Sequence, residues 1–229
     1  MTPLKHHSNQ PIVSLCYFII YIIFILFFNA LPIPSLIGWS NELAQQKTSH
    51  MANSVFLFIN IIVAIIGFIL FYQRFREDGR YMMAHKKQAM IWILVYILFF
   101  FVFACIPFPT LISEGEMTIF NMSFTLSTMQ IPFYLLVLIL TGPLVDVILY
   151  EEIIINQLSS YLPKYVLAVL SALLYAIGHV SMINLWYQAI PYFLNLLITN
   201  ILYIRSNGNL WYILISQVIF NAAFIMILM

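Results

Sequence analysis

Apolar residues follow one another along this chain in long runs that short polar segments separate. A helix needs about 20 mainly apolar residues to cross the hydrocarbon core of a bilayer. The pattern predicts seven such helices, at residues 11–31, 54–72, 88–106, 131–152, 165–183, 187–204 and 209–229. The first run is too long, and too poor in small residues at its end, to be a cleaved signal peptide. We therefore expect an all-α, polytopic membrane helix bundle.

Composition excludes a soluble domain. Hydrophobic residues make up 63% of the chain and charged residues 7%, whereas about a quarter of the residues of a soluble domain are charged. Cys16 and Cys105 lie in apolar runs and indicate neither a disulfide framework nor a thiolate metal site. We expect one membrane domain, with helices 1–3 and their loops in residues 1–130 and core helices 4–7 in residues 131–229. The expected partner is the lipid bilayer, and nucleic acid is not expected.

The basic residues predict how the chain is oriented in the membrane. The segment QRFREDGRYMMAHKK, residues 73–87, holds five of the nine Lys and Arg residues and should be cytoplasmic under the positive-inside rule. Alternation of the seven helices then places Lys5, Lys164 and Arg205 on the same side and only Lys47 outside. We therefore expect a multi-pass cell-membrane protein whose amino terminus is cytoplasmic.

A few polar residues lie at membrane depth in the second half of the chain. Asp146 and His179 interrupt two apolar runs, while Gln217 and Asn221 are one helical turn apart and project from one face. A carboxylate at this depth is costly and usually functional. We expect these four side chains to share a cavity that opens toward the cytoplasmic half. The alternative is that His179, Gln217 and Asn221, like Asn184, merely form hydrogen bonds between helices, each worth on the order of 1 kcal/mol.

Two other features mark the helix that carries Asp146. Gly142-Pro143 should kink it just before Asp146, because proline removes a backbone hydrogen bond. Glu151 and Glu152 follow near its cytoplasmic end, where we expect interfacial, solvated side chains rather than catalytic ones.

These residues resemble the motifs of the CPBP family of intramembrane proteases, also called the CAAX protease and bacteriocin-processing (Abi) family. The family pattern is Glu-Glu-x-x-x-Arg, then Phe-x-x-x-His, then His-x-x-x-Asn or Asp. The segment LLYAIGH is similar to the second motif, with Tyr175 in place of Phe and His179 kept. The segment QVIFN is similar to the third, with Gln217 in place of His and Asn221 kept. The resemblance covers roughly residues 131–229.

The first motif can be placed in two registers. In the first, GPLVDVILYE resembles Pro-x-x-Glu-Glu-x-x-Phe-Arg and puts Asp146 and Val147 at the two glutamates and Glu151 at the arginine. In the second, Glu151 and Glu152 are the two glutamates and Asn156 stands where arginine belongs. The Gly-Pro context and the interval to His179 favour the first register, and the sequence leaves the choice open.

The resemblance implies what these residues would do. In the family, glutamates and histidines activate a water molecule for attack on a peptide bond, and an Asn assists. The catalytic candidates here are Asp146, His179, Gln217 and Asn221. Gln217 cannot act as a base, and Asp146 and His179 supply only two of the three or four ligands that zinc normally takes. Zinc is therefore not expected, and the cofactor stays unknown.

The sequence supports two functions and disfavours a third. The first is an intramembrane endopeptidase with impaired catalysis, which cleaves a membrane-inserted or lipidated peptide near the cytoplasmic face. The second is a non-catalytic relative that binds a peptide or membrane partner, for example in bacteriocin self-immunity or bacterial cell-envelope regulation. A transporter subunit is disfavoured, because the chain shows no paired broken helices. Whether the protein is an enzyme stays open at this point.

Overall fold

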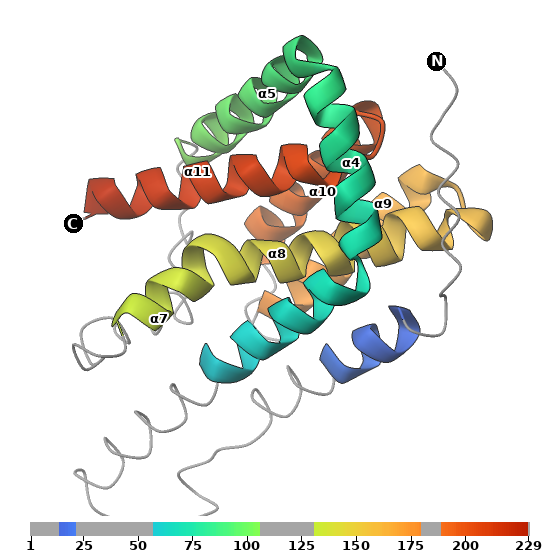
Figure 1. Ribbon diagram of the computed structural model, residues 1–229, viewed down its shortest axis with the longest axis horizontal. Helices are drawn as coiled ribbons and strands as arrows, with labels where there is room; N and C mark the ends of the chain where they lie inside the picture. Colours follow the sequence, from blue (N-terminus) through green and yellow to red (C-terminus); the bar gives the residue numbers. More distant parts are fainter. Residues whose placement is uncertain (1–13, 22–56, 106–130, 180–188, 229) are drawn as a thin grey trace, which may run out of the picture.

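The computed structural model describes residues 14–21, 57–105, 131–179 and 189–228, and their regular structure is entirely helical (Figure 1). This confirms the expected all-α class. The α-helices are residues 14–21, Leu57–Leu70, α4 (Tyr72–Ala84), α5 (Lys86–Ala104), α7 (Ile131–Leu136), α8 (Gly142–Asp146), α9 (Lys164–His179), α10 (Ala189–Arg205) and α11 (Leu210–Leu228). The helical structure also includes two π-helical segments, η1 (Val137–Thr141) and η2 (Val147–Asn156), and a 3-10 turn, η3 (Gln157–Ser160).

In the structure, fewer helices are long and apolar enough to span a membrane than the seven that the sequence predicts. Within the described residues, Lys86–Ala104 and Pro132–Ser160 are each long and apolar enough to cross a bilayer. Leu57–Leu70 and α4 together make a third span if the pair is counted as one, although the chain bends by 70° between them. Three more apolar helices are shorter when they are counted over Lys164–Ile177, Ala189–Arg205 and Leu210–Ala223. Most of the predicted span 11–31 lies outside the described residues. The count of seven spans therefore stays a prediction.

The segment that we expected to be a cytoplasmic loop is largely the helix α4. Figure 1 shows α4 turning away from Leu57–Leu70. Its buried face carries Arg74, Phe75 and Asp78, while its other charged residues are exposed. Arg74 and Asp78 are four positions apart and form an ion pair, the spacing at which helical side chains meet. Pairing and burial of one face thus make a polar segment helical.

Helix Pro132–Ser160 continues through Gly142-Pro143, where we expected a kink. The proline cannot donate a backbone hydrogen bond, and the helix widens into a π-turn just before it. The Gly142 N–H donates to the Val137 carbonyl, five positions earlier. A Cβ at Gly142 would lie 2.9 Å from that carbonyl oxygen, so the close approach requires glycine. The π-helical segments absorb the irregularity without a break, and such segments are frequent at functional sites.

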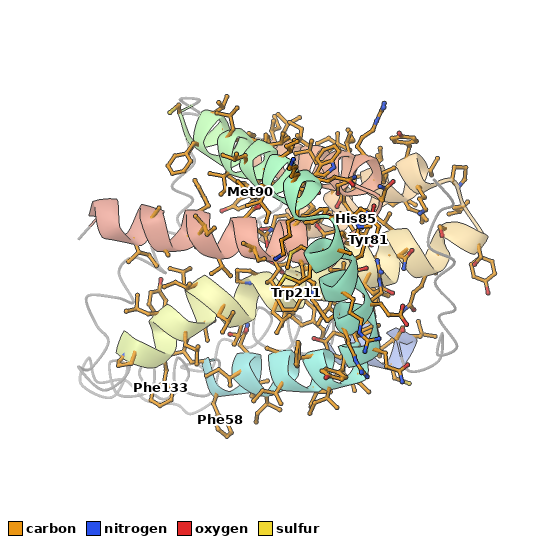
Figure 2. The ribbon with its side chains drawn as sticks, turned by 45° about the horizontal axis from the view of Figure 1, so that its top comes forward. Phe58, Tyr81, His85, Met90, Phe133 and Trp211 are labelled. Carbon is orange, nitrogen blue, oxygen red and sulfur yellow. The ribbon has the colours of Figure 1, made fainter. Side chains whose placement is uncertain are left out.

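The core of the described part lies where helix Pro132–Ser160 meets α9, α10 and α11. Helix α9 packs on both α10 and η2, and α11 packs along α5 and helix Pro132–Ser160. Fully buried apolar side chains such as Ile148, Leu167 and Ile213 fill these contacts. On the outside, Phe58 and Phe133 are exposed and point away from the bundle (Figure 2). An apolar interior with an apolar exterior is the arrangement of a helix bundle in lipid.

Candidate functional site

Glu151 and Glu152 are among the most buried residues of the described chain. Glu151 is 0% exposed and Glu152 is 2% exposed. The expectation that their side chains are solvated is wrong, and their depth relative to the membrane interface stays a prediction. The reason is tertiary: η2 contacts α9, α10 and α11, so that every residue from Val147 to Ile155 is buried. Two carboxylates in such surroundings need partners or a function.

The Glu152 carboxylate is fully partnered. Arg74 Nε on α4 donates to Glu152 Oε2 at 2.9 Å. Asn156 Nδ2 lies 3.2 Å from Oε1 and 3.0 Å from Oε2, and Gln157 Nε2 lies 3.4 Å from Oε1. Charge-assisted hydrogen bonds from a guanidinium, together with those from two amides, hold this buried carboxylate in place. Glu152 is therefore an anchoring group.

Arg74 and Asp78 extend this network to the turn before α11. The Arg74 guanidinium also contacts Asp78 and the Gly208 carbonyl, and its Nη2 lies 3.5 Å from the Tyr203 hydroxyl. Asp78 Oδ2 accepts from the Leu210 N–H at 2.9 Å, at the start of α11. A carboxylate at this position satisfies a backbone N–H that the helix itself leaves free. The network joins α4, η2 and α11.

The indole of Trp211 closes the same junction. Its Nε1 donates to the Phe75 carbonyl at 2.6 Å, and its ring packs edge-on against Phe75 with centroids 5.5 Å apart. Figure 2 shows Trp211 beside α4. A Cβ at Gly79 would lie 3.1 Å from Trp211 Nε1, so glycine lets the two helices approach closely. The start of α11 is thus held to α4 by both polar and aromatic contacts.

Glu151 differs sharply from its neighbour. Neither of its carboxylate oxygens has a hydrogen-bond partner within the part of the chain that the structure describes. It interacts electrostatically with Asp146, five positions earlier on the same helix, and with the Tyr96 hydroxyl on α5. A carboxyl group that is buried without a partner destabilises a fold. Groups of this kind are concentrated at functional sites.

Asp146, at the end of α8, is partly exposed and lies among tyrosines. Its carboxyl interacts electrostatically with the hydroxyls of Tyr17, Tyr21, Tyr150 and Tyr175. The Tyr150 and Tyr175 rings pack edge-on, with centroids 5.1 Å apart. Tyr175 is the residue that replaces Phe in the second motif. The Tyr17 hydroxyl donates to the Val63 carbonyl at 3.1 Å, so the phenols around Asp146 are in part already engaged.

The other predicted site residues are only partly accounted for. His179 is the last residue of α9, and its side chain lies outside the described residues. Asn221 Nδ2 donates to the Leu138 carbonyl at 2.9 Å, which holds α11 against η1 rather than reaching Asp146. Gln217 Oε1 is buried without a described partner. The predicted cavity shared by Asp146, His179 and Asn221 therefore stays a prediction, while α8 and α11 do lie in contact.

No cluster of three or more His, Cys, Asp or Glu side chains that could hold a metal ion occurs within the described ranges. The carboxyl groups of Asp146 and Glu151 are the two acidic groups left at the site, because Glu152 is bound to Arg74. What this arrangement can do by itself is accept a proton and present phenol and amide donors to a polar ligand.

The geometry supports the second register of the first motif. Glu151 and Glu152 form a buried pair, and Asn156 contacts Glu152 four positions later, as an arginine at that place in the motif could. Sequence reasoning missed Arg74, Asp78 and the tyrosines near Asp146. The Arg74–Asp78 spacing was a visible signal for an ion pair, but nothing in the sequence indicates that it would meet Glu152.

The described chain is thus an apolar helical membrane protein with acidic groups buried in one helix. Residues 127–223 match the model of a protein family described as type II CAAX prenyl endopeptidase Rce1-like. This match confirms the family resemblance for residues 127–223. No curated protein and no solved structure matches the chain.

Proposed function

We propose that the protein is an intramembrane endopeptidase of this family, whose site opens to the cytoplasmic half of the membrane. Its substrate class is a lipidated or membrane-inserted peptide, in keeping with the prenyl endopeptidase description of the matched family. The observation that carries the proposal is the Glu151 carboxyl, which is fully buried and has no described partner. Burying such a group costs free energy, and ionisable groups at membrane depth usually have a function such as proton transfer.

In the proposed reaction, Glu151 acts as the general base. It takes a proton from a water molecule, whose oxygen forms a bond to the scissile carbonyl carbon. The carbon–nitrogen bond then breaks, and the proton passes to the leaving nitrogen, which leaves an acid and an amine. His179 is the proposed partner in proton transfer, and the second N–H of the Asn221 amide and the Tyr150 hydroxyl are the proposed donors to the peptide. Proton transfer by a positioned side chain typically contributes 10²–10⁴-fold.

The departures from the motifs indicate a slow enzyme. Gln217 stands where the third motif has histidine, and an amide cannot exchange a proton at neutral pH. The same replacement favours a second candidate function, in which the protein binds a peptide without cleaving it. The buried Gln217 Oε1, which lacks a described partner, supports a ligand contact in that case.

Peptide release separates the two functions. We expect the purified protein in phospholipid vesicles to release the residues that follow the prenylated cysteine of a synthetic CAAX peptide. Mass spectrometry of the released fragment measures the reaction, and the same peptide without its prenyl group is the control. If the folded protein retains the prenylated peptide but releases nothing, the endopeptidase proposal is contradicted and the binding function is supported.

We further propose seven membrane spans with a cytoplasmic amino terminus in the cell membrane. Single cysteines at Arg76 and at Lys47, in a chain with Cys16 and Cys105 replaced by serine, test this orientation. A membrane-impermeant maleimide added to intact cells should label the cysteine at position 47 and leave position 76 unlabelled until the cells are lysed, because the basic segment lies inside. Labelling of position 76 in intact cells would overturn this topology.

A further inference from the structure

The first motif lacks its arginine in this chain. In the register that the geometry supports, position 156 carries asparagine instead. An arginine there would be four positions after Glu152, at the spacing that lets a helical Glu and a following cation pair. Asn156 keeps a contact to Glu152 but supplies no charge. Taken within residues 127–223 alone, the buried Glu152 carboxylate would be uncompensated.

Arg74 supplies the missing charge from outside the region that matches the family. It lies on α4, 78 positions before Glu152, and donates from Nε at 2.9 Å. Arg74 itself is 8% exposed, so the pair is shielded from water. The guanidinium is further fixed by Asp78 and by the Gly208 carbonyl. The planar guanidinium is therefore held in one orientation toward η2.

We infer that Arg74 serves as the arginine of the first motif, contributed by the amino-terminal part of the chain, and acts as a positioning residue for Glu151. This inference rests on the proposed function. Glu151 and Glu152 are adjacent on η2, so the rotation of this helix sets both side chains at once. By holding Glu152 on one side, Arg74 leaves Glu151 directed elsewhere and without a partner. The site is then incomplete without α4.

A swap of the arginine between the two positions tests this inference. Arg74→Gln should lower kcat by about 100-fold, as expected for a displaced catalytic group. It should also lower the melting temperature by about 10 °C, because it leaves a buried carboxylate unpaired. The double variant Arg74→Gln with Asn156→Arg should recover most of the rate but only part of the melting temperature, because an arginine at position 156 can pair with Glu152 but leaves Asp78 without the Arg74 guanidinium. Arg74→Lys keeps the positive charge but lacks the planar guanidinium and its several N–H donors. This variant should fold and show an intermediate kcat.

Rates of peptide release are normalised to folded protein, and melting is followed in detergent. Arg76→Gln, on the exposed face of the same helix, is the matched control and should change neither quantity. If Asn156→Arg restores neither the rate nor the melting temperature, the inference is overturned. If it restores the melting temperature but not the rate, while the unmodified chain cleaves the peptide, Arg74 is only a structural residue and the inference is overturned. If no version of the protein, including the unmodified chain, cleaves the peptide, the endopeptidase proposal fails and with it the positioning role of Arg74, while a recovered melting temperature still supports the pairing of Arg74 with Glu152.

Discussion

Replacing Glu151 by glutamine is expected to reduce the rate of peptide release by about 10²–10⁴-fold, the loss typical of a removed general base. The amide has the shape of the carboxyl group but cannot take a proton from water. Stability should not fall, because the variant removes a buried carboxyl that has no described partner. The measurement combines the rate of peptide release with thermal unfolding in detergent. A loss of rate without a loss of stability would identify a functional group.

Asp146→Asn is the comparison that decides between the two registers of the first motif. If Glu151 is the base, Asp146→Asn should reduce the rate much less, since it removes only a neighbouring charge. If Asp146 is the base, the two results are exchanged: Asp146→Asn abolishes release and Glu151→Gln leaves it largely intact. That exchange would contradict the mechanism proposed for Glu151.

Much of the fold could be predicted because membrane helices leave a strong signal in the sequence. Apolar runs at 88–106 and 131–152 correspond to Lys86–Ala104 and Pro132–Ser160. The bend before α4 and the π-helical segments around Gly142-Pro143 could not be predicted. The π-helical segments depend on which backbone N–H groups reach the carbonyls near Pro143. The bend depends on which face of α4 packs against the rest of the protein. Both are effects of tertiary structure.

Some residues of the candidate site could be predicted from the sequence, but their arrangement in space could not. The acidic pair Glu151–Glu152 is visible in the sequence, yet its position near the end of an apolar run indicated solvated side chains. η2 is buried by α9, α10 and α11, which follow it in the chain, and by contacts from the helices before α5. No local sequence pattern indicates these contacts. The same holds for Arg74, whose partner Glu152 is 78 positions away. Pairings over such separations are set by packing, so local spacing cannot reveal them.

Asp78→Asn is expected to destabilise the protein by about 3–5 kcal/mol, as removal of one partner from a buried ion pair does. Asp78 is 0% exposed and serves two groups, the Arg74 guanidinium and the Leu210 N–H at the start of α11. Asparagine keeps one acceptor oxygen, so its amide N–H₂ must face one of these two donors. We expect the melting temperature in detergent to fall by about 10 °C.

The control is Glu77→Gln, which makes the same change of charge at the neighbouring, exposed position of α4. An exposed ion pair is worth about 0–1 kcal/mol, so this variant should melt close to the unmodified protein. The comparison separates a general effect of charge on α4 from the specific junction with α11. Equal melting temperatures for the two variants would show that Asp78 does not hold α11 to α4. A selective loss in Asp78→Asn would show that the contact between α4 and the start of α11 stabilises the protein, and that residues before position 127 support the part that matches the family.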